Sequence, residues 1–353
     1  MADNSAAREE VVLSLADPER RLRRVRLVQE LWRPRVGPEF HGANGGTSWE
    51  LRFPRPAVER MEYKLELTDA DEGVQTICDP ENPRRARGPF GDKSVLEFPG
   101  YTAPAWLEGD VPAGRTCTVD IRSRTLRTTV AVTVWSPPGA VDRRPLPLLV
   151  AHDGPEYAEY SGLIRFLAGA CAAGDLPLLR VALVPPIARN RDYSASALYA
   201  RALAREILPR LEPLAPTEGG ARGRAGMGTS LGALAMLHAH RLYPDTFGGL
   251  FLQSGSFFRQ RFDRHEAGFP HFRRISRFVG RILAAREWPD AISVTMTCGS
   301  AEENLTNNRA VAAALARQGY DVRLRLTRDT HNWVAWRDAF DPHLRGFLER
   351  LWG

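Results

Sequence analysis

Hydrophobic and polar positions along the chain follow different periods in different regions. Between residues 48 and 107, short runs alternate apolar and polar side chains, and proline, glycine and aspartate separate the runs. Short strands that follow one another without helices are typical of a small β-sandwich. The clearest alternating runs are residues 49–53, 61–67 and 94–98.

The residues before this region read as a helix up to about Trp32 and then as a loop rich in proline and glycine. The densest basic run, residues 20–26, falls on this predicted helix, just after Asp17-Pro18. A solvated helix face explains the run better than a nucleic-acid surface does, because no aromatic residues alternate with the arginines and no zinc-finger spacing accompanies them.

From residue 113 onward, apolar strands and helices alternate. Two strands at 117–121 and 128–135 precede an apolar run at 146–151, which is typical of a strand buried on both faces. This rhythm predicts a doubly wound, mostly parallel sheet flanked by helices. We therefore expect a helical segment and loop at 1–47, a β-sandwich at 48–112 and an α/β domain at 113–353. Within the last part we expect strands at 178–184, 224–227, 247–253, 292–298 and 322–326, and helices at 162–173, 196–211, 230–240 and 305–318, with one more at the end.

Composition narrows the class of protein. The 353 residues are 43% hydrophobic and 25% charged with a net charge of +6, as in a globular protein. The four cysteines lie far apart, which argues against a zinc site and a disulfide scaffold. We expect no metal, no cofactor, and no nucleic-acid or membrane partner. The first thirty residues lack the apolar stretch of a signal peptide or membrane helix, so we predict a cytoplasmic protein. The oligomeric state is not specified.

The most informative motif is Gly228-Thr229-Ser230-Leu231-Gly232, between the strand at 224–227 and the helix at 230–240. A serine on such a turn can act as a nucleophile when the flanking glycines allow the turn to be sharp. The first amides of the helix then point into the same space and can stabilise an oxyanion. The alternative is that Ser230 caps the helix and Gly232 is a packing residue.

Two later strand ends supply partners for this serine. Glu302 and Glu303 follow the strand at 292–298, and His331 follows the strand at 322–326. The order serine, acid, histidine is that of the α/β-hydrolase fold, in which the histidine moves the serine proton and the acid orients the histidine. We favour Glu302 over Glu303 as the acid. The alternative reading places both acids in the first turn of a helix, where the helix dipole favours them.

Further candidates surround this set. Asp153 and Gly154 follow the strand at 146–151, where the fold supplies a second oxyanion amide beside that of Leu231. Arg189 and Arg191 either hold an anionic or phenolic substrate or pair with Asp192 and Glu206 to brace their loop. Tyr157 and Trp333 complete the predicted substrate contacts.

Together these motifs resemble the esterase family that includes enterochelin esterases and esterase D. The likeness spans about residues 115–350. It rests on Asp153-Gly154, Arg191-Asp192-Tyr193, the Ser230 pentapeptide, Ser254-Gly255-Ser256-Phe257, Gly299-Ser300-Ala301-Glu302 and His331-Asn332-Trp333. The resemblance implies ester hydrolysis with Ser230 as nucleophile, His331 as general base and acid, and Glu302 as orienting carboxylate. It also implies an immunoglobulin-like early-set sandwich before the catalytic domain.

The siderophore branch of that family cleaves trilactone esters of iron–catecholate complexes in the cytoplasm, so the resemblance implies a small ester, such as an iron-siderophore, as substrate. The sequence departs from the family pattern in two places: Asp329-Thr330 stands where many members have two glycines, and the acid is one of a glutamate pair. We predict a serine carboxylic-ester hydrolase; an acyltransferase of the same superfamily and a non-catalytic binding protein are the alternatives.

Overall fold

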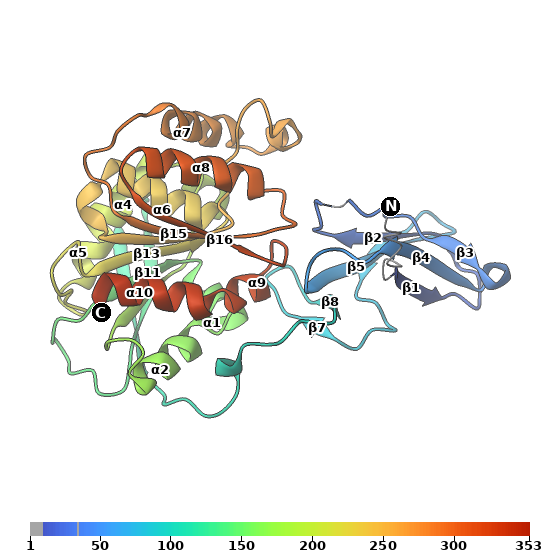
Figure 1. The fold of residues 1–353 in the computed structure, drawn as a ribbon, viewed down its shortest axis with the longest axis horizontal. Coiled ribbons are helices and arrows are strands. Elements are labelled where there is room, and N and C mark those ends of the chain that lie inside the picture. Colours follow the sequence, from blue (N-terminus) through green and yellow to red (C-terminus); the bar gives the residue numbers. More distant parts are fainter. Residues whose placement is uncertain (1–9, 34) are drawn as a thin grey trace, which may run out of the picture. The chain divides into compact units, whose positions relative to one another are not determined.

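The computed structural model describes residues 10–33 and 35–353 and divides the chain into two compact units (Figure 1). The first unit runs to Thr102 and also includes two short later segments, Gly299–Glu303 and Arg328–Asn332. The second unit holds the rest, Ala103–Cys298, Asn304–Thr327 and Trp333–Gly353. Each unit has its own hydrophobic interior, so we describe them one at a time.

The first unit contains two antiparallel sheets packed around one core. One sheet has the order β1-β4-β3, and the other has the order β2-β5-β8-β7 with β6 beside β5. Side chains from both sheets meet in a single cluster that includes Leu13, Leu51, Val25 and Leu65. The strands are β1 (Glu10–Ala16), β2 (Leu22–Gln29), β3 (His41–Ala43), β4 (Ser48–Pro54), β5 (Arg60–Asp69), β6 (Val74–Ile77), β7 (Arg85–Ala86) and β8 (Lys93–Glu97).

The β-rich region is confirmed, but the predicted N-terminal helix is wrong. β1 pairs with β4 and β2 pairs with β5, so the expected boundary at residue 47 divides sheets that are continuous. Along β2, Val25 and Leu27 are buried in the core, whereas Arg24, Arg26 and Val28 at the alternate positions are partly or fully exposed, which is the period of a strand. Asp17 ends β1 in a turn, where its carboxylate accepts the amides of Arg21 and Leu22. Residues 1–9 of the expected segment lie outside the described chain.

The basic run on β2 is a solvated face, as expected, although of a strand. Its arginines pair with nearby carboxylates: Arg24 and Arg26 both contact Glu39, and Arg26 also contacts Glu66. Local acids therefore offset the positive charge of this face.

The second unit is built on an eight-stranded sheet with the order β16-β15-β14-β13-β11-β12-β10-β9. The neighbouring strands between β15 and β12 in this order pair in parallel. β10 pairs antiparallel with both β12 and β9, so the antiparallel part lies at one edge of the sheet. The mostly parallel sheet predicted from the sequence is confirmed. The strands are β9 (Arg115–Ser123), β10 (Thr128–Ser136), β11 (Leu148–His152), β12 (Arg180–Val184), β13 (Arg224–Thr229), β14 (Gly249–Gln253), β15 (Ser293–Gly299) and β16 (Asp321–Thr327).

Helices cover both faces of this sheet (Figure 1). Alternate residues of β11 enter different cores, because Val150 packs with one set of helices and Leu149 with the other. The first set is α4 (Ala197–Ala202), α5 (Leu208–Leu211), α6 (Leu231–Leu242), α7 (Phe272–Ala284) and α8 (Leu305–Arg317); the second is α1 (Gly154–Tyr160), α2 (Leu163–Ala173) and α10 (Arg345–Trp352). The short helices α3 (Arg189–Asp192) and α9 (Trp333–Asp338) follow β12 and β16.

Helices α1, α3 and α7 were not predicted. The expected helix at 196–211 is interrupted by a π-helical turn at Leu203–Ile207. Cys171 and Cys298 are buried, whereas Cys78 is partly buried and Cys117 is exposed. No helix among residues 10–33 and 35–353 is long and apolar enough to cross a membrane.

Candidate active site

Ser230 lies on a sharp turn between β13 and α6. Its backbone has φ 54° and ψ −120°, a conformation that non-glycine residues adopt rarely and at a cost in strain. Ser230 stands at the N-cap position of α6, but its side chain makes no capping hydrogen bond, so the helix-cap alternative is met in position and not in hydrogen bonding. Its amide donates to the Gln253 carbonyl at 2.9 Å, and this bond holds the turn against β14. The geometry is that of a nucleophile elbow.

The two glycines of the motif allow this turn for different reasons. A Cβ on Gly228 would lie 2.5 Å from the carbonyl carbon of Gly232, so only glycine lets β13 and α6 approach this closely. A Cβ on Gly232 would meet Asp153 Oδ2 at 3.1 Å and His152 Cβ at 3.3 Å, which are side-chain atoms with some freedom to move. Gly228 is therefore the stricter requirement.

Ser256, in the segment after β14, contacts the candidate nucleophile directly. The two hydroxyl oxygens of Ser230 and Ser256 lie 3.0 Å apart, and the Ser256 amide donates to the Ser230 carbonyl at 3.1 Å. Asn308 of α8 holds this segment by accepting the Gly255 amide and donating to the Gly255 carbonyl, both at 3.0 Å. The sequence pointed to Ser256 only as part of the motif Ser254-Gly255-Ser256-Phe257 and suggested no role for it, although its place after the strand next to β13 was a usable signal.

His331 and Glu302 form a close pair within the first unit. The Nδ1 atom of His331 lies 3.0 Å from Glu302 Oε2, and the other carboxylate oxygen accepts the Gly299 amide at 2.7 Å. The Glu302 side chain is fully buried, whereas that of His331 is 29% exposed. A carboxylate at Nδ1 fixes the tautomer and the orientation of an imidazole, so Glu302 sets how the His331 ring is held.

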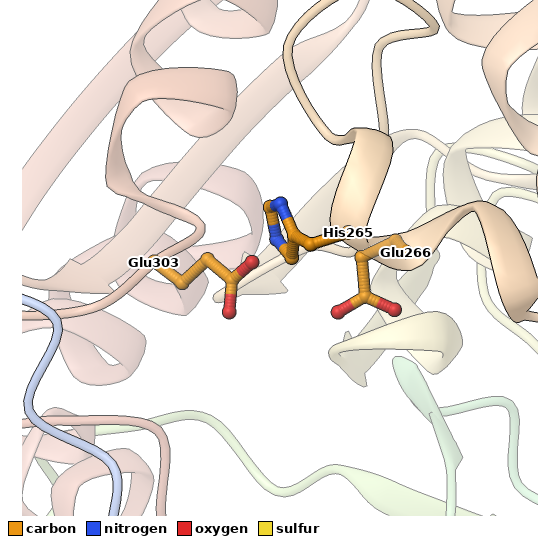
Figure 2. A group of neighbouring side chains, drawn as sticks. All are labelled: His265, Glu266 and Glu303. Atoms are coloured by element: carbon orange, nitrogen blue, oxygen red, sulfur yellow. The ribbon is translucent and has the colours of Figure 1, made fainter.

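This pairing distinguishes between the two predicted acids. Glu302 is the residue hydrogen-bonded to His331, and α8 begins only at Leu305 with no acid in its first turn, so the helix-dipole alternative is wrong. Figure 2 shows Glu303 from the segment before α8, together with His265 and Glu266 from the short helix Arg264–Gly268. A Cβ on Gly299 would lie 2.3 Å from the Asp329 carbonyl oxygen, so glycine is needed where the two short segments of the first unit meet.

Asp153 shapes the segment expected to supply an oxyanion amide. It has a left-handed conformation (φ 50°), and α1 starts at the next residue, Gly154. Amides in the first turn of a helix have no acceptor within that helix, which leaves the Gly154 and Leu231 N–H groups suited to an oxyanion. The Asp153 amide instead donates to the Tyr193 hydroxyl at 3.3 Å.

Arg189 holds this segment through a bidentate ion pair with the Asp153 carboxylate. Its Nε and Nη2 atoms each lie 2.8 Å from a different carboxylate oxygen of Asp153. The carboxylate is buried and the arginine is about one-third exposed, so water screens the pair only in part. Arg189 therefore braces the segment after β11, whereas the predicted bracing alternative named Asp192 and Glu206 as its partners.

His152 lies under the start of α6 and is fully buried. Its Nδ1 is 3.1 Å from the Gly232 carbonyl, which can only accept, so Nδ1 carries the proton. Burial lowers the pKa of His152 to about 3, so the ring is neutral. The ring also stacks on Tyr193, with centroids 4.6 Å apart. His152 thus connects β11 to α6, the helix that follows Ser230.

The prediction that Tyr157 contacts the substrate is wrong. α1 turns its side chain into the core, where it is fully buried and its hydroxyl donates to Gln253 at 2.8 Å. Arg191 pairs with Asp192, as the bracing alternative expected, but Glu206 accepts from Ser123 and Thr125 instead of an arginine. Trp333 is half-buried against Tyr157 and remains a candidate.

Comparison with known proteins places the chain in a family. Residues 123–347, more than half of the chain, match the family described as Putative esterase. The chain belongs to this family. It is therefore a carboxylic ester hydrolase, and the resemblance inferred from its motifs is confirmed.

Two curated relatives of this esterase are iron(III) enterobactin esterases. The enzyme of Dickeya dadantii is 28% identical over 212 residues, which are 57% of this chain and 48% of that enzyme. The enzyme of Escherichia coli is 24% identical over 312 residues, 85% of this chain and 73% of that enzyme. The esterase thus spans about half of the Dickeya enzyme and nearly three-quarters of the Escherichia coli enzyme in these alignments.

A solved structure shares the fold of this esterase along nearly its whole length. The enterobactin esterase of Shigella flexneri, determined in the presence of enterobactin, superposes with a TM-score of 0.75 at 22% identity and covers 97% of this chain and 92% of its own. The fold is accordingly that of the α/β-hydrolases, preceded by a β-rich domain.

Proposed function

We propose that this esterase hydrolyses a siderophore-like ester, such as a catecholate trilactone, with Ser230 as nucleophile, His331 as general base and Glu302 as orienting acid. The observation that carries the triad is the 3.0 Å contact between His331 Nδ1 and Glu302 Oε2, in a pair whose acid is fully buried and whose imidazole is partly exposed. The strained turn at Ser230 supports the choice of nucleophile.

In the proposed reaction, Ser230 Oγ attacks the ester carbonyl carbon while His331 Nε2 takes the hydroxyl proton. The oxygen of the tetrahedral intermediate accepts hydrogen bonds from the Leu231 and Gly154 amides. The intermediate collapses as the alcohol leaves with the proton from His331. Water then attacks the acyl-enzyme with the same base and releases the carboxylic acid and free Ser230.

The buried Glu302 has a defined part in this scheme. Its Oε1 atom is held by the Gly299 amide at 2.7 Å, so Oε2 stays directed at Nδ1. A buried carboxylate in this position stabilises the imidazolium that forms when the serine proton is transferred. The proposed substrate class comes from the relatives, because both curated sequences and the Shigella structure are enterobactin esterases.

The triad is tested with a fluorophosphonate probe. We expect wild-type protein to be labelled on Ser230, and Ser230→Ala and His331→Ala to lose labelling. Ser276→Ala is the matched control, because Ser276 lies on α7, where its hydroxyl donates to the Arg273 carbonyl at 3.4 Å. Full labelling of Ser230→Ala would refute the choice of nucleophile.

The substrate class is tested separately with a panel of esters. Iron-loaded and iron-free catecholate trilactones are compared with aryl acetates, for wild type and Ser230→Ala. We expect kcat/KM to be highest for a trilactone. Turnover of aryl acetates alone would refute the siderophore assignment while leaving the serine esterase intact.

A further inference from the structure

The residue two positions before His331 organises the backbone around the imidazole. Oδ1 of Asp329 accepts the Thr330 amide at 2.7 Å and the Asn332 side-chain amide at 2.9 Å. The same Asn332 amide donates to the Thr330 hydroxyl at 3.1 Å. Both chain neighbours of His331 are therefore fixed to one carboxylate, and this carboxylate is one of the two departures from the family pattern.

Asp329 is in turn paired with Arg60, at the start of β5. The Arg60 Nη1 atom lies 3.5 Å from Asp329 Oδ2, and the arginine side chain is only 3% exposed. Arg60 Nη2 also contacts Glu62 Oε1 at 3.4 Å. Lys93 Nζ lies 3.6 Å from Glu62 Oε2 and 2.7 Å from Glu30 Oε1. Charged side chains of alternating sign therefore form a continuous series from the surface of the first unit to the histidine segment.

Because the Arg60–Asp329 ion pair is buried, breaking it should cost more free energy than breaking an exposed pair. Desolvation raises the pKa of Asp329 to about 7, and Arg60 opposes this rise by favouring the ionised form. Removing one member of a buried ion pair leaves the other charge uncompensated, which is far more costly than losing an exposed pair.

Backbone hydrogen bonds attach both short segments to the same β-rich unit. The Glu59 amide donates to the Arg328 carbonyl at 2.7 Å, and the Trp32 amide donates to the Ala301 carbonyl at 2.9 Å. Ala301 is also part of the hydrophobic core of this unit. The segments that contain Glu302 and His331 are thus held by residues just after β2 and just before β5, early in the chain.

We propose that Arg60 is a positioning residue for ester hydrolysis, acting through Asp329 to fix the orientation of His331 beside Glu302. The proposal rests on the proposed triad and gives the N-terminal domain a part in catalysis. Arg60 does not touch the reacting atoms; it holds the residue that holds the histidine segment.

The test combines kinetics with a double-mutant cycle in the full-length protein. Arg60→Met is expected to lower kcat for an aryl acetate by about 10–100-fold, because misplacing a catalytic group by about 1 Å costs up to about 100-fold. KM should change by less than about threefold, since Arg60 is not proposed to contact the substrate. Active enzyme is counted by fluorophosphonate titration, so loss of folded protein does not lower the measured kcat.

The cycle asks whether Arg60 acts through Asp329. In an Asp329→Asn background, Arg60→Met should change kcat by no more than about twofold, because the contact it would break is already gone. An equal fall of kcat in both backgrounds would overturn the proposal. If Arg60→Met does not fold, Asp329→Asn alone must still lower kcat with little change in KM, and an unchanged kcat would overturn it too.

Tyr63→Phe is the matched control for general loosening of the domain. Tyr63 is buried on the same strand and donates to Asp79 at 2.6 Å, away from the histidine segment. We expect it to keep wild-type kcat, and a fall equal to that of Arg60→Met would overturn the proposal. Ser230→Ala distinguishes failure of the proposed triad from failure of the positioning role. If Ser230→Ala retains activity, the triad is refuted. If Ser230→Ala is inactive and Arg60→Met is fully active, only the positioning role of Arg60 is refuted.

Discussion

Replacing Gly228 with alanine tests whether the turn at Ser230 depends on the close approach of β13 and α6. The added Cβ would lie 2.5 Å from the carbonyl carbon of Gly232 and 2.8 Å from the Ala233 nitrogen. Both are backbone atoms, so no side-chain rotation removes the clash. Restoring an ordinary contact of 3.4 Å requires the first turn of α6 to retreat by about 0.9 Å.

A shift of that size moves both the nucleophile and the Leu231 amide. Since a misplacement of about 1 Å can cost about 100-fold in rate, we expect kcat for an aryl acetate to fall by about 100-fold, and fluorophosphonate labelling to slow in parallel. Overpacking of this kind also lowers the free energy of unfolding by about 1–3 kcal/mol, which urea unfolding measures.

Gly280→Ala provides the comparison, because Gly280 is exposed on α7 and a Cβ there meets nothing within 4 Å. It should leave kcat unchanged and stabilise the protein by about 1 kcal/mol, the difference between glycine and alanine within a helix. A Gly228→Ala enzyme whose kcat stays within threefold of wild type would refute the argument that this contact sets the turn.

Three further predictions concern other parts of the second unit. Arg189→Lys keeps the charge but loses the two-pronged contact with Asp153, so kcat should fall about 10-fold with little change in KM; equal kcat would exclude a bracing role. Ser256→Ala removes the hydroxyl beside Ser230, and loss of about 1 kcal/mol of hydrogen bonding should lower kcat about fivefold in steady-state assays, an effect that Ser276→Ala should not reproduce. Burial lowers the pKa of His238 in the folded protein to about 4. As the pH drops from about 6.5 to about 4, the unfolded chain is therefore protonated at this residue before the folded protein is, and the free energy of unfolding falls. Urea unfolding of His238→Leu should therefore show a pH slope smaller than that of wild type by about 1.4 kcal/mol per pH unit in this window, and parallel slopes would contradict the assignment.

Much of the catalytic domain follows from local pattern. Strands buried on both faces are nearly continuous apolar runs, so β11 and β14 are visible in the sequence. The same reading fails for β2, because the closely spaced arginines of residues 20–26 suggested a helix face, although Val25 and Leu27 follow the two-residue period of a strand. α7 was missed because its regular pattern of buried positions, among them Ile275, Val279 and Ile282, is interspersed with many arginines.

The candidate site was predictable where chemistry sits at strand ends. Ser230, Glu302 and His331 were selected because each follows a strand and because they come in the order serine, acid, histidine. The direction in which a side chain points is harder to predict from the sequence. Nothing in the local sequence indicates that Tyr157 of α1 points inward to Gln253. The pairing of Arg60 with Asp329 joins residues far apart in the sequence, so no window of the chain could indicate it.

The composition of the first unit limits how this chain can be divided or recombined. A fragment beginning at residue 103 would keep Ser230, yet it would lack the Trp32 and Glu59 amides that hold the Ala301 and Arg328 carbonyls. Likewise, a chimera that takes its β-rich domain from a relative without an arginine at position 60 would bury the Asp329 carboxylate without its cation. The unit of exchange is therefore not a continuous stretch of sequence, because Arg60 and the two short segments must be transferred together.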